Sequence, residues 1–236
     1  MRITSLDRID SWVQEWMWEK GVKKIIAISG WSSAEKLEWA DPEIVKRYND
    51  SISAYVSAII DGTLKMLQDY RVAILTWGTK WWVPEDAMMI AKKYDFPTIW
   101  VYPARGAKSA LSDTIIDCAI EVKSIFWESR WWDESPVFAK LADASVVLWG
   151  WAGTLIEVAH ALKINEGLID KWLKPKYIIP VSGLPGMWSL VQLLPWKKDV
   201  KKLTFPENDI KTWQQVADFL HKKLNLEDDH KDNDRY

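Results

Sequence analysis

Cysteine and histidine are scarce in this chain of 236 residues, which has one cysteine, Cys118, and three histidines. A single cysteine excludes a disulfide framework and fits a reducing compartment. The scattered histidines show no metal-ligand spacing, so we expect no metal site. No apolar run approaches the roughly 18 residues of a membrane span, and the N-terminus lacks the apolar segment of a signal peptide. We therefore expect a cytoplasmic protein with no membrane partner.

An excess of one charge sign is also lacking. The chain has 31 Lys and Arg against 33 Asp and Glu, so it carries no basic field that would attract nucleic acid. Its length favours one domain, which we place at residues 1–225. Residues 226–236 have too few apolar side chains to pack, and we expect them to form a disordered polar tail.

Glycine is under-represented and tryptophan is over-represented. At the average usage of about 7%, a chain of this length would carry roughly 17 glycines. It has 10 glycines and 18 tryptophans. The surplus of one residue roughly matches the deficit of the other, and the positions of the tryptophans indicate why.

Apolar runs of strand length alternate with stretches of helical periodicity. The expected strands cover residues 24–29, 71–76, 97–102, 144–148 and 176–181, with a further strand within 115–122. The expected helices cover residues 5–19, 43–69, 83–95 and 135–143, a stretch that ends near 163, and a C-terminal segment at 210–224. This alternation predicts an α/β fold, a Rossmann-like three-layer sandwich around a mainly parallel sheet of about six or seven strands. Ligands of such sheets bind at the carboxyl ends of the strands.

Three loops at those carboxyl ends contain tryptophan where glycine is usual. They read Gly30-Trp31-Ser32-Ser33, Trp77-Gly78-Thr79-Lys80-Trp81-Trp82 and Trp149-Gly150-Trp151-Ala152-Gly153-Thr154. A strand-to-helix turn favours glycine, because the backbone often needs positive φ and must approach a ligand closely. With glycine in place of tryptophan, all three become glycine-rich loops of the kind that hold anions.

We therefore hypothesise that many of these tryptophans stand for glycine, because UGA codons that an alternative genetic code reads as glycine were translated as tryptophan. The favoured positions are Trp31, Trp77, Trp81, Trp82, Trp100, Trp149, Trp151, Trp172, Trp188 and Trp196. Trp12 and Trp39 are expected to be genuine, and Trp16, Trp18, Trp127, Trp131, Trp132 and Trp213 are left open. The alternative takes every tryptophan at face value, as an aromatic surface for sugars or single-stranded nucleic acid. The negative net charge makes nucleic acid the less favoured of these two partners.

The third loop carries a resemblance to a known family. Residues 149–157 align with the signature P-G-G-x-G-T-x-x-E of the LOG (Lonely Guy) Rossmann family, part of the SLOG superfamily that includes molybdenum-cofactor carrier proteins. The residues that match as written are Gly150, Gly153, Thr154 and Glu157. Trp151 matches if it is glycine, and Trp149 replaces the family's proline in either case. The loop at 77–82 is similar to the family's second glycine loop, and the resemblance covers roughly residues 22–225.

The resemblance implies two candidate functions. In the family's phosphoribohydrolases, which release a base from a nucleoside 5′-monophosphate, the signature Glu acts with an Arg that lies shortly before the preceding helix. Glu157 matches the catalytic Glu, whose carboxylate would stabilise oxocarbenium-like charge. The Arg position holds Glu134, which leaves Arg130 as the substitute catalytic residue. This departure favours a nucleotide or phosphate-ligand binding protein, a carrier or sensor, over the alternative of a hydrolase.

The expected ligand site combines the three loops with an arginine that follows the third strand. Its residues are Gly30, Trp31, Ser32, Trp77, Gly78, Thr79, Lys80, Trp81, Trp82, Arg105, Gly150, Trp151, Ala152, Gly153 and Thr154. Backbone N–H groups would hold the phosphate, so no additional cofactor is required, and the ligand is a nucleotide or a nucleotide-containing cofactor. By analogy with the family, we expect a homo-oligomer.

Overall fold

A computed structural model of the chain describes residues 2–3, 8–30, 41–77, 82–109, 111–112, 114–124, 132–150, 152–184 and 197–229. Its centre is a sheet of seven strands in the order β1-β5-β4-β3-β2-β6-β7, and every pair is parallel. The strands are β1 (Arg2–Ile3), β2 (Lys24–Gly30), β3 (Val72–Thr76), β4 (Thr98–Pro103), β5 (Cys118–Val122), β6 (Ala144–Leu148) and β7 (Tyr177–Pro180). The predicted α/β, Rossmann-like fold class is confirmed.

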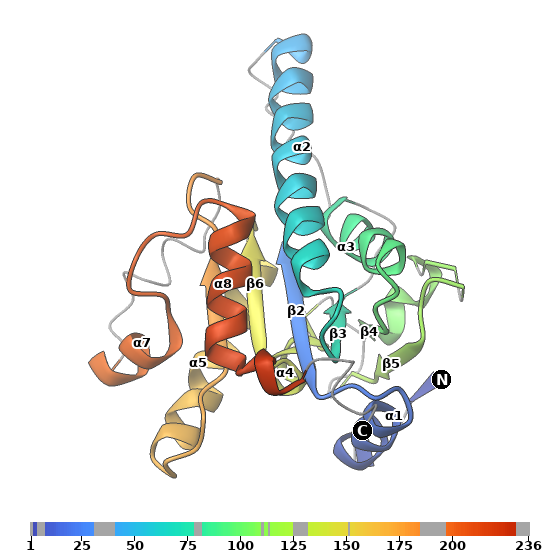
Figure 1. The fold of residues 1–236 in the computed structure, drawn as a ribbon. Coiled ribbons are helices and arrows are strands. Elements are labelled where there is room, and N and C mark those ends of the chain that lie inside the picture. Colours follow the sequence, from blue (N-terminus) through green and yellow to red (C-terminus); the bar gives the residue numbers. More distant parts are fainter. Residues whose placement is uncertain are drawn as a thin grey trace.

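Helices cover both faces of this sheet (Figure 1). One face carries α2 (Pro42–Leu67), α3 (Trp82–Lys93) and α8 (Trp213–Leu224). The other carries α1 (Ile9–Glu19), α4 (Ser135–Leu141), α5 (Ala152–Ile169) and α7 (Lys198–Thr204). Because both faces are covered, the central strands are continuous apolar runs rather than alternating patterns.

The side chains of β2 show how one apolar run serves two cores. Ile26 and Ile28 pack on the side of α2, α3 and α8, while Ile25 and Ala27 pack on the side of α1 and α4. This is the period of two that a pleated strand imposes. Ser29 follows the same alternation and points to the α4–α5 side, where it meets a side chain of α5.

Local signals explain where two of the helices begin. The Asp41 side chain accepts a hydrogen bond from the backbone N–H of Glu43 at 2.8 Å, which caps α2. Thr212 and Gln215 form a reciprocal capping box at the start of α8. Gly62, inside α2, leaves room for the indole of Trp213, because a Cβ there would lie 2.5 Å from Trp213 Cδ2. A genuine tryptophan at 213 therefore fits the packing of α8 on α2.

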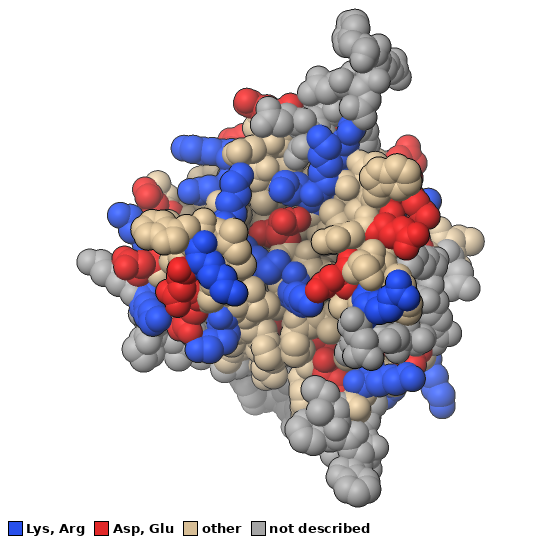
Figure 2. All heavy atoms as spheres, turned by 90° about the horizontal axis from the view of Figure 1, so that it is seen from below, with Lys and Arg blue, Asp and Glu red and all other residues tan. Residues whose placement is uncertain are grey.

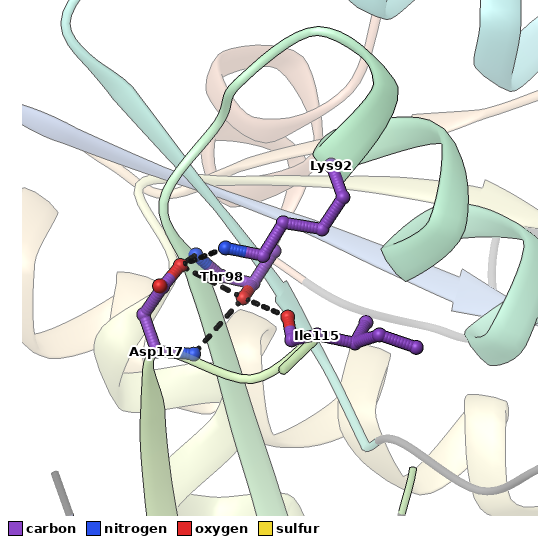
Figure 3. Close-up of polar contacts among 4 residues, drawn as sticks. All are labelled: Lys92, Thr98, Ile115 and Asp117. Atoms are coloured by element: carbon purple, nitrogen blue, oxygen red, sulfur yellow. Dashed lines mark hydrogen bonds and ion pairs between the residues drawn. The ribbon is translucent and has the colours of Figure 1, made fainter. Parts of the chain in front are cut away.

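A polar cluster at the amino ends of β4 and β5 fixes these strands to the end of α3 (Figure 3). Asp117 Oδ2 accepts hydrogen bonds from Lys92 Nζ at 2.6 Å and from the Thr98 backbone N–H at 2.8 Å. The Thr98 hydroxyl lies 2.6 Å from the Ile115 carbonyl oxygen. Burial would raise the pKa of Asp117, but the hydrogen bonds from Lys92 and Thr98 outweigh it and lower the pKa.

The view from the amino ends of the strands shows Lys and Arg interspersed with Asp and Glu (Figure 2). In the described part of this face, charges of both signs alternate over short distances. No helix in the described ranges is long and apolar enough to cross a membrane.

Several boundaries differ from the prediction. The sequence pattern did not predict β1 or α7, and α5 runs to Ile169 rather than ending near 163. The extension of α5 is held by tertiary contacts, because the buried Asn165 side chain bonds both the N–H and the C=O of Lys176 at 2.7 Å. Residues 226–229, predicted to belong to the tail, instead form a 3-10 turn (Leu226–Asp229), because Leu226 is buried in the core. Residues 230–236 lie outside the described residues.

Candidate functional site

The candidate site lies where the strand order reverses. β2 pairs with β3 on one side and with β6 on the other. Strands are therefore added to the sheet in opposite directions from β2. Such a switch point is where ligands of open parallel sheets bind, beyond the carboxyl ends of the strands. The predicted loops after β2, β3 and β6 all begin at this edge.

Gly30, the last residue of β2, permits a close approach of three elements. It pairs with Leu148 of β6. A Cβ at Gly30 would overlap the Leu148 carbonyl oxygen and would lie 2.6 Å from Cγ1 of Val83 in α3. No side chain can therefore occupy this position without moving backbone atoms.

The turn from β6 into α5 is closely packed at Gly150 and open at Gly153. A Cβ at Gly150 would lie 2.5 Å from Cβ of the buried Thr154, one turn ahead. A Cβ at Gly153, in the exposed first turn of α5, would meet no atom of the described residues within 4 Å. The open side of Gly153 is where an anion would approach the first N–H groups of α5.

Tryptophan occupies a left-handed backbone conformation at both helix starts. Trp82, which begins α3, has φ of 45°, and Trp149, which directly follows β6, has φ of 47°. A bulky residue in this region is an outlier, whereas glycine adopts it readily. Both positions are among those predicted to be glycine.

Trp172, which lies outside the site, also has a backbone conformation that favours glycine. It has φ of 58° and follows α5, where Leu173 N–H bonds Leu168 C=O at 2.9 Å and Trp172 N–H bonds Ile169 C=O at 3.0 Å. These two bonds define the Schellman helix end, whose left-handed residue is usually glycine. The same bond pair ends α1 with Gly21 in the left-handed position. The Trp172 side chain is 96% exposed and gains no packing from its strained backbone.

The indoles of Trp82 and Trp149 pack against each other. Their ring centroids lie 5.3 Å apart with the planes tilted by 47°. Trp149 is fully buried and belongs to the core cluster on the α2–α3–α8 side, against which Trp82 packs. The two indoles are therefore packed together on the α2–α3–α8 side of the sheet.

Trp100 and Trp77, the other two predicted glycine positions among the described residues, do not share this signature. Trp100 is extended in β4, buried, and stacked on Tyr102 with ring centroids 3.8 Å apart. Glycine in a strand interior would weaken that strand, so the structure gives no backbone reason for glycine at 100. Trp77 is half-buried, and its indole nitrogen has no hydrogen-bond partner within the described chain.

Glu157 lies on the opposite side of the sheet from the two indoles. It is buried in α5 and accepts a hydrogen bond from the Ser29 hydroxyl. Burial raises the pKa of Glu157 to about 8, although the Ser29 bond lowers it in part. The carboxyl group is therefore mostly neutral at pH 7.

Glu134, which immediately precedes α4, forms a second buried carboxyl group nearby. Burial is the main cause that raises the pKa of Glu134 to about 9, and the neighbouring Glu157 carboxyl group contributes a smaller part of this rise. Its Oε2 has no hydrogen-bond partner among the residues that the structure describes. The place that the resemblance assigns to arginine therefore holds a neutral acid.

Ser29 was not among the predicted site residues. The only signal in the sequence was a hydroxyl at the end of an apolar strand, one residue before a glycine. Its partner lies 128 residues away, and only the fold brings the two together.

The remaining predicted residues divide into two groups. Arg105 lies in the short 3-10 helix η2 (Ala104–Ser109) after β4 and is exposed, and Ala152 is exposed at the start of α5. Outside the described residues lie Trp31, Ser32, Gly78, Thr79, Lys80, Trp81, Arg130 and Trp151. Within the described ranges, no group of three or more His, Cys, Asp and Glu side chains could hold a metal ion.

The fold is similar to solved structures of cofactor-binding proteins. The molybdenum cofactor binding protein from the phototrophic bacterium Rippkaea orientalis matches with 21% sequence identity and a TM-score of 0.56, over 86% of this chain and 98% of that chain. The molybdenum cofactor carrier protein of Chlamydomonas reinhardtii matches with 18% identity and a TM-score of 0.56, over 86% of this chain and 99% of that one. These similarities show a shared fold. No protein-family model and no curated protein matches the chain.

Proposed function

We propose that this protein is a carrier-type binding protein for a nucleotide or a nucleotide-containing cofactor, whose phosphate is held by backbone N–H groups at the starts of α3 and α5. We propose further that the natural chain has glycine at Trp82, Trp149 and Trp172, because its UGA codons specify glycine. The observation that carries the proposal is the left-handed backbone of Trp82 and Trp149 at two helix starts beside the strand-order reversal.

Helix physics supports an anion at this position. The first N–H groups of a helix have no partner within the helix, and the helix dipole places partial positive charge there. The 18 residues of α5 begin beside the open Gly153, and α3 begins beside Gly30. With glycine at 82 and 149, the start of α3 and the turn that precedes α5 would each lose an indole side chain. Since the similar structures are named for molybdenum cofactor, this cofactor is the first candidate cargo to test.

The charges of the buried acids favour binding over hydrolysis. Stabilising an oxocarbenium-like transition state requires an ionised carboxylate. The pKa values of about 8 and 9 leave Glu157 and Glu134 mostly neutral at pH 7. Glu134 also supplies no positive charge to hold a phosphate. A carrier that binds the nucleotide without cleaving it is consistent with both features.

The coding DNA tests the glycine proposal directly. We expect UGA codons at positions 82, 149 and 172, and a UGG codon at Trp12. Mass spectrometry of the protein from its own organism should show a tryptic peptide mass with glycine at each UGA position. UGG codons at 82 and 149 would refute the glycine proposal.

Ligand binding tests the carrier proposal. The restored chain, defined here as carrying Trp77→Gly, Trp81→Gly, Trp82→Gly, Trp149→Gly and Trp151→Gly, should bind adenosine 5′-monophosphate (AMP) or molybdenum cofactor saturably in calorimetry. Adding Gly153→Trp should abolish binding, because an indole would then cover the first N–H groups of α5. A folded restored chain that binds neither ligand would contradict the proposal.

A further inference from the structure

We propose that this protein couples phosphate binding to proton uptake, with the carboxyl groups of Glu157 and Glu134 as the groups that hold the protons. The neutral acid pair would permit a phosphate to bind at the start of α5, and the ionised pair would repel it. This inference rests on the proposed function, because it concerns the phosphate that we place at the start of α5.

Both acids lie on the α4–α5 side of the sheet. Glu157 belongs to α5, and its carboxyl group accepts a hydrogen bond from Ser29, the residue next to Gly30 at the end of β2. Glu134 immediately precedes α4, the helix that packs against α5. Only 6% of Glu157 and 2% of Glu134 are exposed. The bond to Ser29 therefore holds a buried acid at the same sheet edge as the proposed phosphate site.

Helix geometry brings Glu157 close to that site. Glu157 lies five residues after Ala152, the first residue of α5, which corresponds to about 7.5 Å along the helix axis. Helical side chains lean toward the N-terminus of their helix, which shortens the separation from an anion bound there. An ionised Glu157 would repel the phosphate and would compete with it for the partial positive charge of the helix start.

The surroundings of Glu157 leave this repulsion poorly screened. A cavity of about 10 Å³ lies beside its carboxyl group, which is room for about one water molecule. Phe138, Val147 and Val158 form apolar walls of this cavity. Charges interact more strongly where water is excluded than in bulk solvent. The charge state of Glu157 should therefore have a large effect on an anion at the start of α5.

Glu134 extends the range over which the pair holds a proton. Its Oε2 has no hydrogen-bond partner among the residues that the structure describes. Burial raises the pKa of Glu157 to about 8 and is the main cause that raises the pKa of Glu134 to about 9. Both values lie above the usual range of a carboxyl group, so the pair is protonated at pH 7 and loses its protons as the pH rises through 8 and 9.

The other titratable groups around α5 act differently. His160 lies on α5 itself, and burial lowers its pKa, so the imidazole stays neutral from pH 7 to pH 9. Asp133, beside Glu134, contributes to the raised pKa of that acid. Lys197, before α7, lowers the pKa of Glu166 farther along α5. Of the described residues around this helix, the acid pair is therefore the group that we expect to change charge in this pH range.

Titration calorimetry with AMP tests the coupling in the restored chain. The affinity should fall at least about tenfold between pH 7 and pH 9, because both acids then ionise near the phosphate. A phosphate monoester changes charge near pH 6, so AMP itself keeps its charge over this range. Adding Glu157→Gln and Glu134→Gln should hold the ratio of the two affinities within about threefold. Glu207→Gln, at an exposed glutamate, is the matched control and should keep the tenfold fall.

Proton uptake supplies a second measurement. A tenfold coupling corresponds to a shift of one pKa unit, so AMP binding at pH 8.5 should take up about half a proton. Calorimetry in buffers of different ionisation enthalpy measures this number. Ser29→Ala should move the fall in affinity to higher pH, because the Ser29 hydroxyl lowers the pKa of Glu157. Circular dichroism at pH 9 identifies the chains that remain folded.

The outcomes separate the coupling from the proposed function. Equal affinities for AMP at pH 7 and pH 9, without proton uptake, would overturn the coupling and leave the carrier proposal intact. A full tenfold fall that persists in the folded double Gln variant would also overturn it, because another group would then titrate. A folded restored chain that binds neither AMP nor molybdenum cofactor at pH 7 or pH 9 would overturn both proposals.

Discussion

At the scale of single residues, backbone conformation separates tryptophans that fit from those that do not. Trp213 packs into the space left by Gly62, whereas Trp82, Trp149 and Trp172 adopt a conformation that glycine prefers. The exposed Trp172 isolates this effect, because its side chain has little packing to lose.

We predict that Trp172→Gly raises the free energy of unfolding by about 1 kcal/mol, because a non-glycine residue in the left-handed region is strained by roughly that amount. Urea denaturation at pH 7 measures the change. The control is Trp18→Gly, an exposed position inside α1, where glycine should lower stability by up to about 0.5 kcal/mol. A loss of stability in Trp172→Gly comparable to that of the control would contradict the prediction.

Glu157 makes stability depend on pH. Its folded pKa of about 8 lies above the unfolded value, which is about 4.3. The contribution of the buried neutral acid is therefore fully present below about pH 4 and is lost as pH rises toward 8. We predict that Glu157→Gln, which still accepts the Ser29 hydrogen bond, gains more than about 1 kcal/mol relative to the parent chain between pH 5 and pH 8.

Urea denaturation at the two pH values provides the measurement. Glu207→Gln, at an exposed glutamate, is the control and should show no such pH-dependent gain. A gain that is equal at pH 5 and pH 8 would mean that Glu157 is ionised in the folded protein.

At the scale of elements, the Asp117 cluster joins α3, β4 and β5 at the edge opposite to the candidate site. We predict that Asp117→Asn lowers the free energy of unfolding at pH 7 by about 1–2 kcal/mol, because it removes the Lys92 ion pair and weakens the bond to the Thr98 backbone. The lowered pKa of Asp117 also means that this contribution is lost as pH falls through the folded pKa.

The neighbouring ion pair of α3 offers a matched control for this substitution. Asp61 contacts Lys93 Nζ at 2.6 Å, but both side chains are more exposed than those of the Asp117 pair. Asp61→Asn should therefore cost less than about 1 kcal/mol in the same urea titration. Equal losses for the two variants would show that burial does not strengthen the Asp117 cluster.

At the scale of the whole molecule, the fold is compatible with two functions, binding a nucleotide and hydrolysing it. We predict that the restored chain releases no free base from AMP or guanosine 5′-monophosphate, because both buried acids are mostly neutral at pH 7. Chromatography of overnight incubations measures the base. Release that Glu157→Gln abolishes would restore the hydrolase alternative.

The sequence alone determined the alternation of strands and helices, and hence the fold class, because apolar periodicity reflects local geometry. It also located Trp82 and Trp149 at strand-to-helix turns, since those turns have their own residue preferences. The boundaries were less accurate where distant contacts decide them. α5 extends to Ile169 because Asn165 bonds Lys176 of the next loop, and Leu226 is ordered because the core covers it.

The contacts between distant residues could be seen only in the folded protein. The bond between Ser29 and Glu157 spans 128 positions, and the pKa values of the two buried acids are raised because folding removes them from water. Likewise, the left-handed φ of Trp82 and Trp149 became visible only in the folded backbone. A residue pattern records local preference, whereas burial, protonation and the space for a ligand depend on neighbours that are far apart along the chain.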